Sequence, residues 1–428
     1  MTWDFSTEPE FEEKLAWMRI FMHDQVWPLE VLETDDTTFE RILRSLQAEV
    51  KAQALWATHL PPELGGQGFG QVRLALMHEV EGTSPWGPWV FGNQAPDSGN
   101  GELLALAGTE QQKQRWLYPL LAGEMRSAFS MTEPENAGSD PTRLSTTAVL
   151  DGDEWVINGH KWFSSNAMSA DFLIAMVVTD PDAEPHRRAS MIIVPRDAPG
   201  LNVVRNVPTL AGVERFEMGH PEIYYENCRV PRQNLLGRRG QGFELAQMRL
   251  GPGRIHHCMR WLGQARRAFD AMCERSLQRQ VGGEPLASKQ TIQNWIADSL
   301  AEMTSARLLT LYAAWVMDQR GARGARVEIS MIKYYGAQVL CSVIDRAMQV
   351  HGGLGYTGDM PLEEMYRVAR SARLVDGADE VHRTTVARLV LRGYTAPEGI
   401  WPRDHIPTRR AAAREHYARF LVEAVANA

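Results

Sequence analysis

Two segments carry most of the information in this chain: Phe129-Ser-Met-Thr-Glu-Pro-Glu-Asn-Ala-Gly-Ser-Asp140 and Leu374-Val-Asp-Gly-Ala-Asp-Glu-Val-His-Arg383. The first combines an aromatic residue with hydroxyls, Pro and Gly, so its backbone N–H groups and Thr132 can meet a flat polar ligand. In the second, Asp376 precedes Gly377, and because glycine lacks a Cβ the backbone there can approach a substrate closely. Together they predict a polar ligand-binding loop and a carboxylate placed for chemistry.

The composition limits the classes of protein to consider. A length of 428 residues suggests about two to three domains. The net charge of −8 argues against a general nucleic-acid binder. No run of about 18 apolar residues occurs, so we expect no membrane span, and the acidic amino-terminal segment predicts no signal peptide. The four scattered cysteines favour reduced thiols in a cytoplasmic protein.

The pattern of apolar residues changes twice along the chain. From Glu10 to about Leu121 apolar residues recur at helical spacing. Short β-rich runs separated by turns follow, and helices return from Gly242. The predicted strands are Trp155–Asn158, Phe172–Val178, Ala189–Val194, Leu201–Val204 and Glu222–Tyr225. We therefore predict an α+β fold with domains at residues 1–124, 125–238 and 239–428.

Five segments, in this order and from Phe11 to about Tyr394, resemble those of the acyl-CoA dehydrogenase superfamily. The resemblance implies an amino-terminal helical domain, a central β-barrel or sandwich and a carboxy-terminal helical bundle. Val375 to His382 is similar to the branch that uses Asp as catalytic base and is fused in animals to a kinase-like domain. The tail at residues 395–428 receives no function.

The resemblance implies FAD as cofactor, with Thr132 at the pyrimidine edge of the flavin and Ser139 near the thioester and CoA. Phe163 takes the position of an aromatic residue on the ring, and Ser165 that of a hydroxyl near flavin N5. Alone, the two segments also suit a polar surface loop and a strand with exposed serines. The implied cofactor residues of this half are Phe129, Met131, Thr132, Gly138, Ser139, Phe163, Ser164 and Ser165.

The stretch Arg249-Leu-Gly-Pro-Gly-Arg-Ile-His-His-Cys-Met-Arg260 is predicted to open a helix and to present free N–H groups. Its neighbours His256 and His257 point in different directions on a helix and have no further ligand at metal spacing, so we expect no metal. The resemblance implies that acyl-CoA contacts Ser139, Gly251, Pro252, Gly253, Arg254 and Gly377.

Two further segments resemble those that reach the FAD of a neighbouring subunit, which implies a homodimer or homotetramer. Without the resemblance they suit a solvated helix end and a Gly-rich helix cap. The spacing Gly353-x-Gly355-x-x-Gly358 imitates a dinucleotide fingerprint, but that fingerprint must follow a strand, and here a helical pattern precedes it. The implied residues are Arg279, Gln290, Gln349, His351, Gly352 and Gly353, with Ala378 and Glu380 beside the base.

Asp376 is the predicted base; the alternative is a helix N-cap, for which Asp379 is the better candidate. The implied reaction converts a fatty acyl-CoA of β-oxidation to trans-2-enoyl-CoA. Asp376 takes the α-proton, flavin N5 takes the hydride, and an electron-transfer flavoprotein or similar acceptor takes the electrons. The alternatives are a flavin oxidase similar to nitroalkane oxidase, which also uses Asp, and a non-catalytic acyl-CoA-binding protein.

Overall fold

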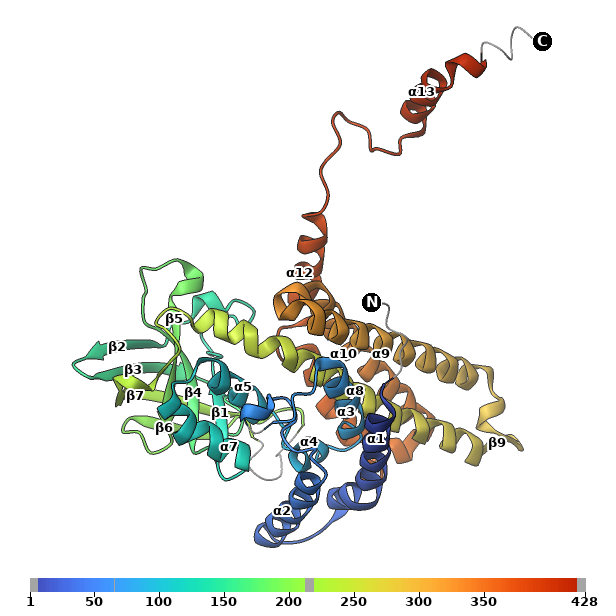
Figure 1. Ribbon diagram of the computed structural model, residues 1–428. Coiled ribbons are helices and arrows are strands. Elements are labelled where there is room, and N and C mark those ends of the chain that lie inside the picture. Colours follow the sequence, from blue (N-terminus) through green and yellow to red (C-terminus); the bar gives the residue numbers. More distant parts are fainter. Residues whose placement is uncertain (1–6, 65, 212–218, 422–428) are drawn as a thin grey trace. The chain divides into compact units, whose positions relative to one another are not determined.

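The computed structural model describes residues 7–64, 66–211 and 219–421 (Figure 1). The described residues exclude residues 1–6 and 422–428. The first stretch begins the segment for which no signal peptide is expected, and the second ends the tail. The chain divides into two compact units, Met1–Arg383 and Thr384–Ala428. None of the helices in the described parts has the length and apolar character needed to cross a bilayer.

The first helices form because their apolar residues recur on one face and their starts are capped. Asp35 accepts the N–H of Thr38 at the start of α2, and Thr109 and Gln112 form a capping box in α6. Leu15 and Met18 of α1 and Leu74 of α3 are fully buried. The helices are α1 (Pro9–Phe21), α2 (Asp36–Ala52), α3 (Gln71–Glu81), α4 (Gly87–Val90), α5 (Asp97–Ala107), α6 (Glu110–Gln112) and α7 (Tyr118–Ala122).

The central strands form one eight-stranded mixed sheet. Seven of them follow the order β6-β7-β3-β2-β4-β5-β8. The eighth, β1, pairs in parallel with β4, which also pairs with β2. The predicted α+β class is confirmed, and the central β-region is a branched sheet. The strands are β1 (Ser127–Ser130), β2 (Thr147–Asp151), β3 (Glu154–Lys161), β4 (Phe172–Val178), β5 (Ala189–Pro195), β6 (Leu201–Asn206), β7 (Pro221–Pro231) and β8 (Leu235–Leu236).

Strand β4 is buried on both faces, which explains its uninterrupted apolar sequence. Leu173, Ala175 and Val177 face a core shared with the other strands. Phe172, Ile174 and Met176 face a second core, which the helices of the first 120 residues and α8 also line. The sheet is thus fixed to helices on one side, and β1 delivers Phe129 to that same side.

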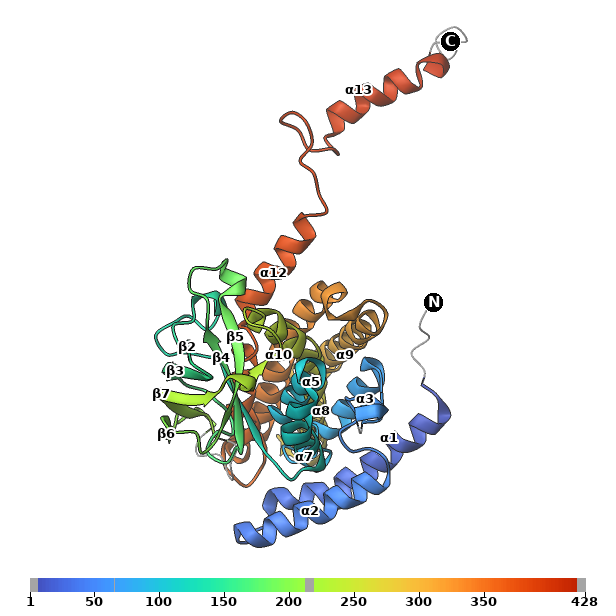
Figure 2. The same ribbon diagram turned by 60° about the vertical axis from the view of Figure 1, so that its left-hand side comes forward.

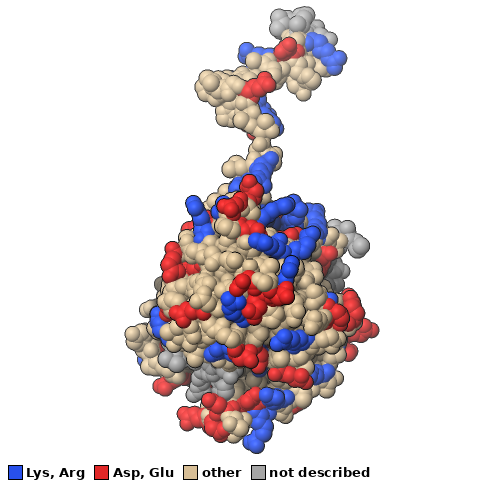
Figure 3. Space-filling model, turned by 90° about the vertical axis from the view of Figure 1, so that its left-hand side faces the viewer, with Lys and Arg blue, Asp and Glu red and all other residues tan. Residues whose placement is uncertain are grey.

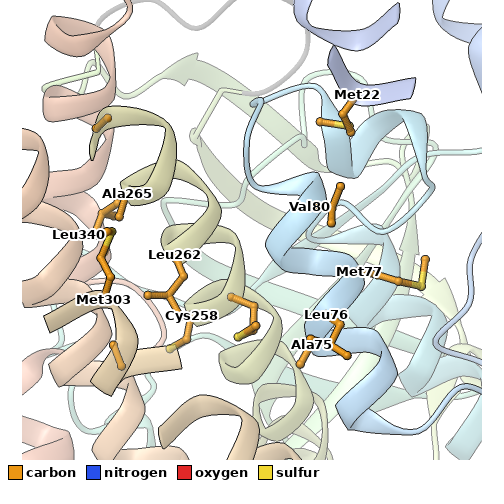
Figure 4. Close-up of a cluster of buried hydrophobic side chains, with 14 of the residues drawn as sticks. Met22, Ala75, Leu76, Met77, Val80, Cys258, Leu262, Ala265, Met303 and Leu340 are labelled. Carbon is orange, nitrogen blue, oxygen red and sulfur yellow. The ribbon is translucent and has the colours of Figure 1, made fainter. Parts of the chain in front are cut away.

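The carboxy-terminal helices pack around α8 (Gly242–Gln278), which lies between the strands and α3 (Figure 2). Their core includes Cys258 and Leu262 of α8, which lie beside Met303 and Leu340 (Figure 4). Residues of α3 such as Ala75 belong to the same core. The other elements are β9 (Gln280–Val281), β10 (Glu284–Pro285), α9 (Gln290–Gly324), α10 (Arg326–His351), α11 (Leu362–Ala369) and α12 (Asp379–Leu391).

The second unit, from Thr384, contains the end of α12 and α13 (Ile406–His416). Trp401 stacks on His405, with ring centroids 4.3 Å apart. None of the described residues of α13 is buried. On the face of the molecule shown in Figure 3, acidic and basic side chains are interspersed.

Candidate active site

The predicted base lies in a tightly held turn. Asp376 has φ +52 and Gly377 has φ +98, both in the left-handed region, where Asp and Asn are tolerated better than most residues. The carbonyl oxygen of Asp376 accepts hydrogen bonds from Arg254 Nε (3.1 Å) and from an Arg254 terminal nitrogen (3.0 Å). His382 Nε2 lies 3.1 Å from the same oxygen. Such strain persists only where surrounding contacts impose it, and it is often found at functional sites.

Lys333 of α10 secures the other side of this turn. Its ammonium group donates to the carbonyl of Ala372 at 2.6 Å and to that of Gly377 at 3.3 Å. The three cationic or imidazole groups that hold the turn therefore come from α8, α10 and α12. The alternative role of Asp376 as a helix cap is not what the structure shows, because α12 begins only at Asp379. Asp379 itself accepts from the side chains of Arg373 and Gln338.

The charges around Asp376 favour its ionised form. Burial by itself would raise the pKa of Asp376, but the neighbouring His257 ring and the charges of Arg254, Arg249 and Lys333 outweigh it and hold the pKa below its usual value. The carboxylate is therefore charged at neutral pH in the free protein and can accept a proton. A ligand that excluded water from this site would raise the pKa of Asp376.

The prediction that Arg249–Arg260 opens a helix is wrong. The helix α8 begins at Gly242, and Pro252 lies inside it. Proline and glycine normally interrupt a helix, but the buried residues on either side, such as Leu245 and Ile255, keep this one continuous. The free N–H groups expected at a helix start are therefore absent from this stretch. Any contacts that it makes with a ligand must come from its side chains, at points where open space lets the ligand approach.

The open space lies beside Gly253. A Cβ placed on Gly253 would meet no atom within 4 Å, whereas one on Gly251 would lie 2.9 Å from Ala322 Cβ. Gly251 and Pro252 are buried within the chain. A substrate can therefore approach α8 at Gly253 and Arg254, next to the turn that carries Asp376.

The predicted flavin loop is attached to the sheet by a fully buried ion pair. Its first residues, Phe129 and Ser130, belong to β1, and the loop proper starts at Met131. Lys161 Nζ, at the end of β3, donates to the carbonyl of Met131 at 2.8 Å and to Glu133 Oε1 at 2.9 Å. Glu133 also accepts from the N–H groups of Ser145 and Thr146. These contacts fix the backbone around Thr132.

The residues that follow β3, beside this loop, present an aromatic ring and hydroxyls. Phe163 has φ +50 and is 41% exposed. The hydroxyl of Ser164 donates to Ser130 Oγ at 3.1 Å, and Ser165 Oγ lies 2.8 Å from His220 Nδ1. The buried indole N–H of Trp162 meets no hydrogen-bond partner within the described parts of the chain. Gly138 and Ser139 are exposed. An exposed ring, an unpaired donor and open backbone fit a flat polar cofactor such as a flavin.

Arg249 connects the loop to the base. Its guanidinium carbon lies 4.2 Å from the centre of the Phe129 ring, its Nε donates to Asn100 Oδ1 at 3.3 Å, and its charge lowers the pKa of Asp376. Burial in turn lowers the pKa of Arg249, and Glu102 beside it has a pKa raised by burial to about 8. The structure thus brings together Phe129, Arg249, Arg254, Asp376 and Gly377.

The second predicted cofactor set lies elsewhere on the chain. Arg279 follows α8 and is about 37 Å along the helix from Arg254, at a rise of about 1.5 Å per residue. The end of α10 is similarly about 27 Å from Lys333. His351 is buried and bonds to Ala347 O, while the other members of this set are exposed: Arg279, Gln290, Gln349, Gly352 and Gly353.

Three residues that surround Asp376 escaped prediction from the sequence. Arg249 and His257 lie in the segment Arg249–Arg260, where the local pattern gives Arg249 no role and suggests at most a metal ligand at His257. Lys333 is a lysine in a long helix, and no local pattern sets it apart. Within residues 7–64, 66–211 and 219–421 there is no group of three or more His, Cys, Asp or Glu placed to hold a metal.

Comparison with known proteins identifies the family. Models of the amino-terminal, middle and carboxy-terminal domains of acyl-CoA dehydrogenases match residues 8–124, 128–228 and 240–391. The chain is 46% identical over 83% of its length to a Mycobacterium tuberculosis protein described as a probable acyl-CoA dehydrogenase, FadE2, of which it covers 87%. It is 40% identical over 91% of its length to rat acyl-CoA dehydrogenase family member 11, and it spans about half, 51%, of that protein.

A solved structure agrees with these matches. A protein from Mycobacterium abscessus described as an acyl-CoA dehydrogenase superposes with a TM-score of 0.87 at 40% identity, covering 91% of this chain and 100% of that one. The resemblance seen in the sequence is thereby confirmed. The chain belongs to the acyl-CoA dehydrogenase family, whose members are FAD-dependent oxidoreductases.

Proposed function

We propose that this protein converts a fatty acyl-CoA to the trans-2-enoyl-CoA, with Asp376 as the base, in a β-oxidation pathway of the cytoplasm. The single observation that supports this most is that Arg249, whose charge lowers the pKa of Asp376, packs on Phe129 of the predicted flavin loop. The carboxylate and the cofactor loop can therefore act on neighbouring carbons of one substrate.

Asp376 would remove the α-proton, and Arg254 and Lys333 would hold its backbone while it does so. The N–H of the turn at Asp376 would donate to the thioester carbonyl and acidify the α-carbon. Phe129, Thr132 and Phe163 would help to hold FAD, which would supply the acceptor for the β-hydrogen and its electron pair, so that the double bond forms between the α- and β-carbons. The two electrons would then pass to an electron-transfer flavoprotein or similar acceptor.

The purified protein is expected to carry about one noncovalently bound FAD per chain, which denaturation releases. Anaerobic titration with acyl-CoAs of increasing chain length should bleach the flavin absorbance with at least one of them. Absence of flavin after preparation with excess FAD would contradict the cofactor residues. Bleaching by nitroalkanes but by no acyl-CoA would instead indicate the oxidase alternative.

We also propose a homodimer, or a tetramer built from dimers, in which each FAD is held by two chains. The support is the separation of the two predicted cofactor sets along α8 and α10, with the second set, apart from the buried His351, exposed at the helix ends. An isologous pairing would place the Arg279 end of each chain at the flavin loop of the other and complete both sites at once.

Mixing two inactive variants tests this sharing. Asp376→Asn lacks the base and Arg279→Glu lacks the distal cofactor contact, so each alone should be nearly inactive. In a co-expressed hybrid, one of the two sites has both Asp376 and Arg279, and the other has neither. Random pairing makes half of the dimers hybrids, and each hybrid has one intact site of two. About a quarter of the parent activity should therefore return. Light scattering would show the assembly. No recovery in a verified hybrid would contradict a shared site.

A further inference from the structure

His257 lies on α8 one turn beyond Arg254 and reaches the predicted base. Its Nε2 is 3.4 Å from Asp376 Oδ2, and both side chains are about a quarter exposed, at 26% and 23%. Its ring lies near that of Trp261, with centroids 6.0 Å apart. The neighbouring His256 turns the other way and bonds to Gln71 Oε1 at 3.1 Å. Of the two adjacent histidines, only His257 faces the active site.

The position of the proton on His257 follows from its other partner. A terminal nitrogen of Arg260, three residues along the same helix, lies 3.1 Å from His257 Nδ1. Because a guanidinium group can only donate, Nδ1 must be the acceptor, and the ring proton must be on Nε2. The structure thus fixes the tautomer that carries its proton on Nε2, the nitrogen 3.4 Å from Asp376 Oδ2.

Arg260 is itself held in place by buried groups. Its other terminal nitrogen lies 3.3 Å from His78 Nδ1 and donates to the carbonyl of Asn93 at 3.3 Å. Burial lowers the pKa of Arg260, while the nearby Glu81 raises it. The guanidinium is therefore anchored to α3 and to the loop after α4, and it presents one fixed donor to His257.

We propose that His257 is a positioning residue for the base: its Nε2–H holds Oδ2 of Asp376, so that Oδ1 faces the substrate, and Arg260 fixes the tautomer that makes this possible. The inference rests on the proposed dehydrogenation. A separation of 3.4 Å is long for a hydrogen bond, and such contacts in free enzymes commonly tighten when substrate binds.

His257 is not a proton relay in this arrangement. Burial and the charge of Arg260 lower its pKa to about 3, so the ring stays neutral at the pH where Asp376 must work. The charged groups that face Asp376 are Arg249 and Arg254 from α8 and Lys333 from α10, with His382 at the backbone from α12. Loss of the His257 N–H would remove stabilisation of the carboxylate and raise the pKa of Asp376.

The test uses an acyl-CoA with sulfur in place of the β-carbon, which can lose an α-proton but has no β-hydride to transfer. Exchange of its α-protons in D2O, followed by mass spectrometry on the FAD-loaded protein, reports the base alone. His257→Leu should slow exchange about 10- to 100-fold, with analogue affinity unchanged and the acid limb of the exchange–pH profile moved to higher pH. His257→Gln keeps an N–H donor of similar reach and should recover most of the rate.

Two controls separate positioning from packing. Arg260→Met frees the tautomer and should give an intermediate rate, while His256→Gln, which alters the neighbour bonded to Gln71, should leave the profile unchanged. Parent-like exchange and an unshifted acid limb in His257→Leu would overturn this inference alone. A parent protein that exchanges no α-proton with acyl analogues of any chain length would overturn the proposed function, and this inference with it.

Discussion

Replacement of Asp376 by Asn is expected to slow flavin reduction by a saturating acyl-CoA by about 10²- to 10⁴-fold, which is the usual contribution of a general base. Asn keeps the shape of Asp but cannot accept the α-proton. It is also one of the few residues that tolerate the left-handed backbone found at this position, with φ +52, so the turn should survive. Stopped-flow absorbance of the FAD-loaded variant measures the rate.

Binding must be shown to persist in this variant. The contacts of Arg254 and His382 at residue 376 reach its carbonyl oxygen, not its side chain, and therefore remain in Asp376→Asn. We expect unchanged FAD content and unchanged affinity for the sulfur analogue. If Asp376→Asn bleaches its flavin as fast as the parent with the best acyl-CoA, the base lies elsewhere.

Asp376→Glu gives a sharper comparison. Glutamate restores a carboxylate but adds one methylene in a site bounded by Arg249, Arg254 and His257. Glutamate is also less tolerant of a left-handed backbone than aspartate. We expect partial activity, between that of Asn and the parent. The strained turn thus offers a physical reason why this chain carries Asp.

Sequence patterns could predict the parts of this fold that rest on local regularity. Phe172–Val178 is an unbroken apolar run, and it forms β4 with the predicted bounds. Ser127–Ser130 and Leu235–Leu236 are too short and too mixed to stand out, and they are strands only because β4 and β5 offer them edges. Pro252 misled the prediction of α8, because burial on both sides overrides its local tendency to end a helix.

The candidate site, like the fold, combines residues that local sequence patterns predict with residues that only the packing of distant segments brings in. Asp376, Gly377 and Arg254 belong to recognisable segments, and the structure brings them together. Lys333 could not be predicted, because its role comes from the packing of α10 against a turn 39 to 44 residues later. His257 stands next to an equivalent-looking His256, and only the orientation of α8 decides which of them meets the carboxylate.

The second large effect concerns the buried pair of Lys161 and Glu133, whose side chains are both fully buried. Lys161→Met should lower the free energy of unfolding by about 3–5 kcal/mol, because it leaves the Glu133 carboxylate buried without its counter-ion. Urea denaturation followed by tryptophan fluorescence measures this. The loop at Met131 and Thr132 loses its anchor as well, so FAD retention should fall in the same variant.

The same assignment predicts how the stability of the parent depends on pH. Burial alone would raise the pKa of Glu133, but Lys161 and the N–H groups of Ser145 and Thr146 lower it to about 2. Because this folded-state pKa lies below that of the unfolded chain, the stabilisation is complete above about pH 4.5 and is lost as the pH falls toward 2.

Two comparisons decide whether burial is the cause of the Lys161→Met effect. Arg229 pairs with Asp151 and Glu154 on the same sheet but is 45% exposed, so Arg229→Met should cost less than about 1 kcal/mol. Adding Glu133→Gln to Lys161→Met removes the unpaired charge and should restore part of the stability, since the amide oxygen still accepts from the loop. A Lys161→Met protein no less stable than Arg229→Met would show that solvent reaches this pair, and the anchor assigned to the flavin loop would then be wrong.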